Sequence, residues 1–254
     1  MILALVQYAP VWENKEKNII KINSILNNIN FNFDAIIFPE MSLTGFTMNS
    51  QKYAETNNDI GFTYFSNLAK KFKKDVFAGI IEDINGTFYN SLIHFNTKGS
   101  VVKTYRKIHL FTLAGEDKYY TEGNEIVITQ IGNIKIGLTI CYDLRFPELY
   151  RFYAKEKVDL ILNIANWPTK RIEHWNVLLK ARAIENQCFI VGVNRVGVDG
   201  KSNKYNGCSS VFNPLGNEIV SVEDEEKIIK AEINLSEVEK VRNKFKFLDD
   251  IKMI

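Results

Sequence analysis

Short apolar runs alternate with amphipathic segments at both ends of the chain, and this alternation limits the folds that it can adopt. Ile2 to Tyr8 and Ala35 to Phe38 are apolar runs of strand length, and residues 14–29 between them carry aliphatic side chains at helical spacing. The second half repeats the pattern around a predicted strand at 158–165. Such alternation is typical of helices packed on the outer faces of sheets. The sequence therefore predicts an α/β protein.

The middle of the chain is different, because predicted strands follow one another without helices between them. The runs at 76–82, 88–95 and 101–107 are separated by Asn-Gly and Lys-Gly turns, which favour antiparallel pairing. Other strands are predicted at 126–130, 135–140, 188–196, 207–214, 216–222 and 227–233, and other helices at 63–74, 148–156 and 173–186. We therefore expect mixed sheets within a single domain spanning residues 1–254, a common size for one α/β domain.

Composition excludes several other classes of protein. Lysine and arginine total 32 against 30 aspartate and glutamate residues, so no strong overall charge attracts nucleic acid or an anionic membrane. Three cysteines without Cys-x-x-Cys spacing and three scattered histidines predict neither a disulfide framework nor a metal site, and we expect no cofactor. The chain start lacks a signal-peptide pattern, and no apolar run approaches the roughly 20 residues of a membrane span. We expect a cytoplasmic protein.

The last segment, residues 235–254, forms a C-terminal tail that differs from the rest. It begins with a helical pattern and ends in FKFLDDIKMI, whose apolar side chains would be unfavourable if exposed on a monomer. The tail either packs on its own domain or packs at an interface with a second subunit. The sequence leaves both alternatives open.

Cys141 lies where the apolar strand pattern at 135–140 gives way to an amphipathic helix within about one turn. A strand-to-helix elbow exposes a side chain at the end of a sheet. It also directs backbone N–H groups and the positive end of the next helix at that side chain, which favours a thiolate and any oxyanion beside it. Taken alone, however, Cys141 also fits the usual role of a free cysteine as a small buried apolar residue.

Three further segments place polar residues after predicted strands, where the active sites of α/β proteins collect. Glu40 follows Pro39 and an apolar strand, so it is either a catalytic carboxylate or a charge that favours a helix start. Lys107 enters an apolar stretch, although an unpaired lysine is rarely buried. Glu116 lies in a polar loop, where a solvated carboxylate is the simpler alternative.

Together these residues supply the parts needed for acyl transfer. Cys141 is a nucleophile, Glu40 is a carboxylate able to act as general base, and Lys107 is a cation for a developing oxyanion. The local sequence does not indicate a Cys–His pair, for which His109 is the one plausible histidine.

Three segments, FPE at 38–40, YRKIHLF around Lys107 and CYDLRFPE from Cys141, resemble in this order the signature segments of the nitrilase (carbon–nitrogen hydrolase) superfamily. The resemblance covers nearly the whole chain, and within the superfamily it is strongest to the bacterial omega-amidases, which hydrolyse the terminal amide of 2-oxoglutaramate and related 2-oxo acids. It implies a four-layer αββα sandwich that usually forms a homodimer through one helical face, with the C-terminal tail lying over the partner.

The resemblance also implies roles for individual residues. It makes Glu40 the general base, Lys107 the oxyanion stabiliser and Cys141 the nucleophile. It places Glu116 where a second glutamate positions the substrate or the lysine, and it places Asn166 and Trp167 in the pocket wall. In this mechanism the backbone N–H of Tyr142 is the second oxyanion donor. Cys-Tyr-Asp at 141–143 resembles the amidase branches, so we expect an amidase and not a nitrilase.

Arg145, four residues beyond Cys141, could return over the first turn and offer a bidentate fork to a substrate carboxylate. An ion pair with Asp143 or Glu148 is the alternative. The expected reaction is hydrolysis of the terminal amide of 2-oxoglutaramate or 2-oxosuccinamate to the acid and ammonia through a cysteinyl thioester. Two other functions remain open: an amidase of the same superfamily acting on deaminated glutathione or N-carbamoyl compounds, and a catalytically inactive scaffold.

Overall fold

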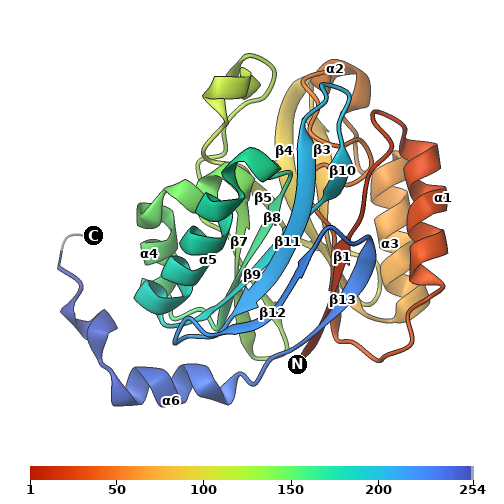
Figure 1. Ribbon diagram of the computed structural model, residues 1–254. Coiled ribbons are helices and arrows are strands. Elements are labelled where there is room, and N and C mark those ends of the chain that lie inside the picture. Colours follow the sequence, from red (N-terminus) through yellow and green to blue (C-terminus); the bar gives the residue numbers. More distant parts are fainter. Residues whose placement is uncertain (253–254) are drawn as a thin grey trace.

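The computed structural model describes residues 1–252 and consists of thirteen strands, six α-helices and five short 3₁₀ helices in that range (Figure 1). The strands are β1 Ile2–Gln7, β2 Ala35–Ile37, β3 Asp75–Ile84, β4 Thr87–Phe95, β5 Val101–Arg106, β6 Ile128–Ile131, β7 Ile134–Ile140, β8 Leu160–Ala165, β9 Phe189–Asn194, β10 Val196–Val198, β11 Lys204–Phe212, β12 Glu218–Glu223 and β13 Lys227–Glu232. The helices are α1 Lys15–Leu26, α2 Ser50–Tyr53, α3 Ile60–Phe72, α4 Pro147–Lys155, α5 Ile172–Asn186 and α6 Ser236–Lys244, with 3₁₀ helices η1 Thr112–Ala114, η2 Glu116–Lys118, η3 Cys141–Arg145, η4 Thr169–Arg171 and η5 Phe247–Asp250.

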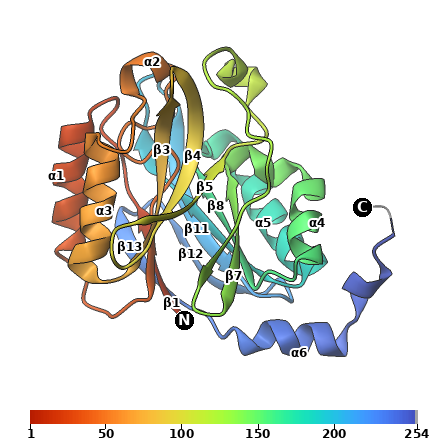
Figure 2. The ribbon, with the colours of Figure 1, turned by 180° about the vertical axis from the view of Figure 1, so that it is seen from behind.

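The strands form two mixed sheets. One sheet has the order β13-β1-β2-β3-β4-β5, and the other has the order β10-β11-β9-β8-β7-β6, with β12 beside β11. Each sheet has a parallel centre, β1-β2-β3 in the first and β7-β8-β9 in the second, with antiparallel strands outside it. Helices α1 and α3 cover the first sheet, and α4 and α5 cover the second (Figures 1 and 2). The prediction of a four-layer αββα sandwich with mixed sheets is confirmed.

Strand β1 shows why these strands read as continuous apolar runs. Leu3 and Leu5 lie in the core between the two sheets, whereas Ala4 and Val6 lie in the core beneath α1 and α3. Successive side chains of a strand point to opposite faces, so a strand covered on both faces is apolar at every position. A third core, around Trp175, joins the second sheet to α4 and α5.

The structure differs from the sequence predictions mainly at the ends of the helices. Helix α1 begins after Asn14, whose side chain accepts a hydrogen bond from the backbone N–H of Lys17. Helix α3 begins at Ile60, three residues before the predicted start. The short helix α2 and the turns η1 and η2 had no periodic apolar pattern to indicate them, since four or fewer residues carry little periodicity.

The C-terminal tail begins by packing on its own domain. Val238 and Val241 of α6 are buried, and Arg242 Nη2 donates a hydrogen bond to the carbonyl oxygen of Val158 at 2.7 Å. After α6 the chain turns and runs along the side of the domain where α4 lies (Figures 1 and 2), and Phe247 is 63% exposed. Residues 253–254 of the predicted tail lie outside the described residues. Within residues 1–252, no helix is both long enough and apolar enough to cross a membrane.

The core between the sheets should carry much of the stability. We expect Leu138→Ala, at a fully buried position of β7, to lower the free energy of unfolding by about 2–5 kcal/mol, because it leaves a cavity between the sheets. The control Ile219→Ala lies on β12, where the side chain is 39% exposed, and should cost less than about 1 kcal/mol. Urea unfolding followed by circular dichroism measures both, and equal losses would contradict this account of the core.

Candidate active site

The carboxyl ends of four strands bring the predicted site residues to one edge of the sandwich. Glu40 follows β2, Lys107 follows β5, Cys141 follows β7, and Asn166 follows β8. Each lies directly after or within a few residues of its strand, so the backbone that positions it is held by the sheet. The structure thus gathers residues that are far apart in the sequence, as the α/β rule for active sites predicts.

The turn that carries Glu40 is held tightly against β3. The N–H of Ser42 donates to the carbonyl oxygen of Gly79 at 2.8 Å, and Met41 has a φ of +45°, in the left-handed region. A Cβ atom at Gly79 would lie 2.6 Å from both the Met41 nitrogen and the Pro39 oxygen. Glycine is therefore required at position 79 for this close approach.

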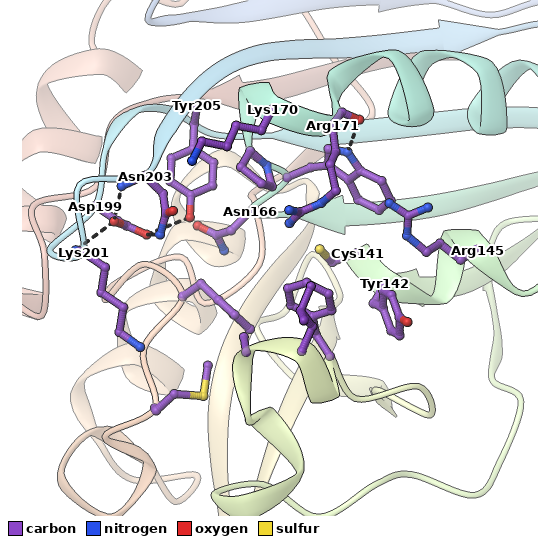
Figure 3. A pocket seen from close by; sticks show the side chains of 17 residues that line it. Cys141, Tyr142, Arg145, Asn166, Lys170, Arg171, Asp199, Lys201, Asn203 and Tyr205 are labelled. Atoms are coloured by element: carbon purple, nitrogen blue, oxygen red, sulfur yellow. Dashed lines mark hydrogen bonds between the residues drawn. The ribbon is translucent and has the colours of Figure 1, made fainter.

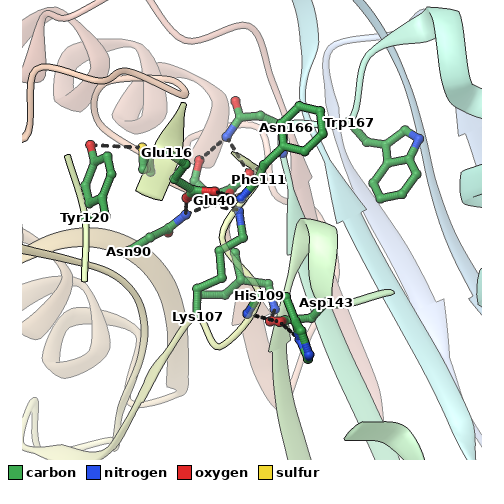
Figure 4. A network of polar contacts seen from close by, with 12 residues as sticks. Glu40, Asn90, Lys107, His109, Phe111, Glu116, Tyr120, Asp143, Asn166 and Trp167 are labelled. Atoms are coloured by element: carbon green, nitrogen blue, oxygen red, sulfur yellow. Dashed lines mark hydrogen bonds and ion pairs between the residues drawn. The ribbon is translucent and has the colours of Figure 1, made fainter. Parts of the chain in front are cut away.

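Lys107 lies between two carboxylates in the interior (Figure 4). Its Nζ is 3.0 Å from Glu40 Oε1 and 2.8 Å from Glu116 Oε2, and all three side chains are fully buried. The solvated-loop alternative for Glu116 is wrong. Its carboxylate also accepts a hydrogen bond from the N–H of Phe111 at 2.6 Å, which turns the η1–η2 segment inward.

Two asparagines complete the network around these charges. Asn90 Nδ2 donates to Glu40 Oε1 at 2.7 Å and to Glu116 Oε1 at 2.9 Å, so it bridges the two carboxylates. The N–H of Asn166 donates to Glu40 Oε2 at 2.8 Å, and its Nδ2 donates to the Glu40 carbonyl oxygen at 2.7 Å. Each carboxylate is therefore held in one orientation, as a buried charge requires.

The charges of this cluster oppose the effect of burial. Burial lowers the pKa of Lys107, but the negative charges of Glu116 and Glu40 outweigh it and raise that pKa above its ordinary value. Burial raises the pKa of Glu116, while Lys107 lowers it, and the pKa stays above the ordinary value. Lys107 is therefore a permanent cation in the resting protein.

Cys141 lies at the predicted elbow. Its φ of +47° is in the left-handed region, at the junction of β7 and η3. Burial raises the pKa of the Cys141 thiol well above its usual range, and Glu40 raises it further while Lys107 lowers it. The resting sulfur is therefore a neutral thiol.

The helix predicted at 148–156 is present as α4, but it does not follow within about one turn of Cys141. The 3₁₀ helix η3 intervenes, α4 begins only at Pro147, and Asp143 Oδ2 accepts the hydrogen bond of the Ile140 N–H at 2.9 Å. The dipole of α4 consequently does not act on the sulfur at close range, and no thiolate is favoured in this way.

Asp143 links the Cys141 turn to the Lys107 segment. Its buried carboxylate accepts hydrogen bonds from the Tyr105 hydroxyl at 2.8 Å, from the His109 N–H at 3.0 Å and from the Ile140 N–H. The Nδ1 atom of His109 also lies 2.8 Å from Asp143 Oδ1 (Figure 4). His109 is thus engaged by Asp143, and the described contacts give no support to a Cys–His pair.

A pocket of about 190 Å³ opens above Cys141 (Figure 3). Its described lining is Phe46, Met48, Phe111, Leu113, Ala114, Cys141, Tyr142, Arg145, Asn166, Trp167, Pro168, Lys170, Arg171, Asp199, Lys201, Asn203 and Tyr205. Four predicted residues, Tyr142, Arg145, Asn166 and Trp167, are therefore brought together with the thiol. Phenyl and indole rings form the apolar part of the wall, and several cations lie around it.

Arg145 points into this pocket and not toward the acidic partners that the sequence left open. Its guanidinium carbon lies 4.8 Å from the centre of the Trp167 ring, and its Nη2 is 3.1 Å from His174 Nδ1. Within residues 1–252, Arg145 forms no ion pair with Asp143 or with Glu148.

Sequence reasoning missed several residues of the site. The sequence signal at Asn90 is its position as an amide in a predicted strand at 88–95, a strand that also carries Ser91 and His94. The loop containing Asp199 and Asn203 carried none, because polar residues in loops are common. Arg171 ends the NWPTKR loop, whose composition favours a small acidic substrate, but that loop did not single out Arg171. Tyr205 lay outside the strand predicted at 207–214, and only the earlier start of β11 at Lys204 brings it to the pocket as a strand residue.

Comparison with known proteins shows the family of the chain. The Carbon-nitrogen hydrolase family profile matches residues 2–243. The chain is 34% identical to an omega-amidase of Escherichia coli K12, covering 96% of this chain and 93% of the relative. It is 31% identical to a 2-oxoglutaramate amidase of Bacillus subtilis, covering 98% and 97%.

Solved structures agree as well. A CN-hydrolase superfamily protein from Xanthomonas campestris, solved with an arsenic adduct in its active site, has a TM-score of 0.94 at 28% identity, covering 100% of this chain and 98% of that one. The family profile and the relatives above 30% identity extend over almost the full length, as the three signature segments indicated. The chain is therefore an enzyme of the carbon–nitrogen hydrolase family, within the nitrilase superfamily.

Proposed function

We propose that this enzyme hydrolyses the terminal amide of a small 2-oxo dicarboxylic acid monoamide, 2-oxoglutaramate or 2-oxosuccinamate, to the acid and ammonia. The observation that carries the proposal is the buried Lys107 held between Glu40 and Glu116, whose charges act on the Cys141 thiol at the pocket. This arrangement provides a nucleophile, a base and a cation, which acyl transfer requires. Relatives named as omega-amidase and 2-oxoglutaramate amidase support the choice of substrate.

In the first half-reaction Glu40 takes the proton of the Cys141 thiol as the Sγ–carbon bond forms. The carbonyl electron pair moves to oxygen, and Lys107 Nζ and the backbone N–H of Tyr142 stabilise this oxyanion. When the oxyanion collapses, the carbon–nitrogen bond breaks and Glu40 returns its proton to the leaving nitrogen. Ammonia departs, and a thioester remains on Cys141.

In the second half-reaction water attacks the thioester carbon, and Glu40 takes the proton of the water. The new oxyanion uses the same two donors. Its collapse breaks the carbon–sulfur bond, the proton returns to Sγ, and the carboxylic acid leaves. One base thus serves both halves, while Glu116 and Asn90 hold Lys107 and Glu40 in position.

The pocket favours a small substrate with a negative charge. About 190 Å³ is less than the roughly 300–1,000 Å³ typical of sites for drug-sized ligands, which argues against a tripeptide-sized compound such as deaminated glutathione. Arg145 lines the pocket and is aimed into it over Trp167, where it can hold the substrate carboxylate. Asn166 and Trp167 form part of the adjoining wall.

Ammonia release from a substrate panel tests the proposal. We expect 2-oxoglutaramate or 2-oxosuccinamate to give a kcat/KM at least about 100-fold above that of neutral amides, nitriles and N-carbamoyl compounds, since charge-assisted contacts are worth about 1.5–3 kcal/mol each. Cys141→Ala, with its fold checked by circular dichroism, is the blank. A preference for nitriles or N-carbamoyl compounds, or near-normal turnover by Cys141→Ala, would contradict the proposal.

The neutral resting thiol predicts an unusual pH dependence of alkylation. Because burial and Glu40 raise the pKa of Cys141, its reaction with iodoacetamide should rise with pH to a midpoint above about 8.5, the ordinary value. Glu40→Gln removes a negative charge, so the midpoint should fall and alkylation near pH 8 should quicken, although amide hydrolysis is lost.

Mass spectrometry of the intact protein and of its peptides measures this reaction at each pH. Glu148→Gln is the control, because Glu148 is exposed and its replacement removes the same charge. A wild-type midpoint below pH 7, or an upward shift in Glu40→Gln, would refute the assignment of a neutral thiol beside a carboxylate base.

We further propose a homodimer in which the C-terminal tail packs against the partner subunit. The support is the pair of rings of Phe245 and Phe247, whose centres lie 5.4 Å apart just after α6 and of which Phe247 is 63% exposed. Phe247→Asp should weaken self-association at least about 10-fold in sedimentation velocity, whereas Leu215→Asp, at another exposed apolar position, should leave it unchanged. A wild-type monomer, or an unaffected Phe247→Asp dimer, would overturn this proposal.

A further inference from the structure

A second arginine, Arg171, lines the same pocket as Arg145. It belongs to η4, just before α5, whereas Arg145 is the last residue of η3, which begins at Cys141. Figure 3 shows both guanidinium groups on the same side of the pocket, above the sulfur of Cys141. Two cations from different segments therefore converge on the region where the substrate must lie.

Neither guanidinium is neutralised by the protein. Among residues 1–252, the ion pairs include no carboxylate partner for Arg145 or Arg171. Burial lowers the pKa of Arg145, and the nearby positive charge of Arg171 lowers it further. Two like charges in one partly buried site are unfavourable unless an anion binds between them.

The carboxylate of the pocket wall, Asp199, is already used by its own loop. Its Oδ1 accepts hydrogen bonds from the N–H groups of Lys201 and Asn203 at 2.8 and 2.9 Å. Its Oδ2 accepts from Asn203 Nδ2 at 2.9 Å and from the Tyr205 hydroxyl at 2.8 Å. Asp199 thus stabilises the loop and leaves the two arginines free for a ligand.

Both arginines are held in position by aromatic side chains. The guanidinium of Arg145 lies over the Trp167 ring, and the guanidinium of Arg171 lies 5.2 Å from the centre of the Phe111 ring. The Trp167 Nε1 donates to the Arg171 carbonyl oxygen at 2.7 Å, so one indole supports both residues. Phe111 in turn is fixed by its N–H bond to Glu116. The pair is therefore preorganised.

The chemistry of two facing guanidinium groups selects a particular kind of anion. A guanidinium binds carboxylate through a planar fork. A 2-oxo acid presents two carboxylate oxygens and a neighbouring keto oxygen, which together offer acceptors to two such forks. A 2-amino acid would instead bring an ammonium group next to two cations, which costs binding energy through repulsion.

We propose that Arg145 and Arg171 form a two-arginine clamp that holds the 2-oxo carboxylate end of the substrate, and that Arg171 is a specificity-determining residue of this enzyme. This inference rests on the proposed function and deepens it. The clamp binds the end of the substrate remote from the reacting amide, so it selects 2-oxo acids over the corresponding amino acids.

Turnover of 2-oxoglutaramate and of L-glutamine separates the clamp from a general charge effect. Arg171→Gln should lower kcat/KM for 2-oxoglutaramate by about 10- to 100-fold, mainly through KM, and should change the value for L-glutamine much less. Arg171→Lys should recover part of the loss, because it keeps the charge without the fork. Lys180→Gln removes an exposed cation from α5 and should match the wild type.

Protection of Cys141 from iodoacetamide by 2-oxoglutarate provides a readout that does not need turnover. We expect 2-oxoglutarate to protect Cys141 in the wild type and in Lys180→Gln, and to protect it at least about 10-fold more weakly in Arg171→Gln. This result supports the clamp even if the amide substrate proves different. Equal losses for 2-oxoglutaramate and L-glutamine, or unchanged protection in Arg171→Gln, overturn it. If the wild type does not hydrolyse 2-oxo amides but 2-oxoglutarate still protects Cys141, the proposed function is refuted and the clamp is not. If the wild type shows neither turnover nor protection, the proposed function and the clamp are both refuted.

Discussion

The ion cluster of Lys107 with Glu40 and Glu116 is the interaction on which the rest of the site depends. Burying three charges is expensive, and a hydrophobic replacement of similar volume would often be as stable. The cluster is tolerable because every carboxylate oxygen has a donor, from Lys107, from Asn90 and Asn166, or from the backbone of Phe111. The cluster contributes to function more than to stability, because it holds a cation and a base in fixed positions beside the thiol.

The two sheets explain how one chain can supply such a cluster. Glu40 and Lys107 come from the first sheet, whereas Cys141 and Asn166 come from the second. The reacting groups therefore meet only when the sheets stack, and the large core between them sets their separation. The geometry of the site therefore depends on the packing of that core, because a shift between the two sheets would move the Glu40 base relative to the Cys141 thiol.

Much of this architecture could be predicted from the sequence, because strands buried on both faces and amphipathic helices have clear patterns. The positions of Glu40, Lys107 and Cys141 after strands were also visible. Glu116 was underestimated, since nothing local indicates that a polar loop turns inward to meet Lys107. Asn90 was missed for a related reason, because its role arises from contacts across 26 residues or more of chain, and such contacts leave no periodic pattern.

Asp143 shows that the signature segments are not separable modules. Its carboxylate accepts hydrogen bonds from the Tyr105 hydroxyl and the His109 N–H of one segment and from the Ile140 N–H of the other. The conformation of each turn therefore depends on the other. A designer who grafts the Cys141 turn onto a new scaffold would have to transplant the stretch from Tyr105 to His109 with it. Substitutions in either segment during divergence must likewise be compatible with a shape that both segments share.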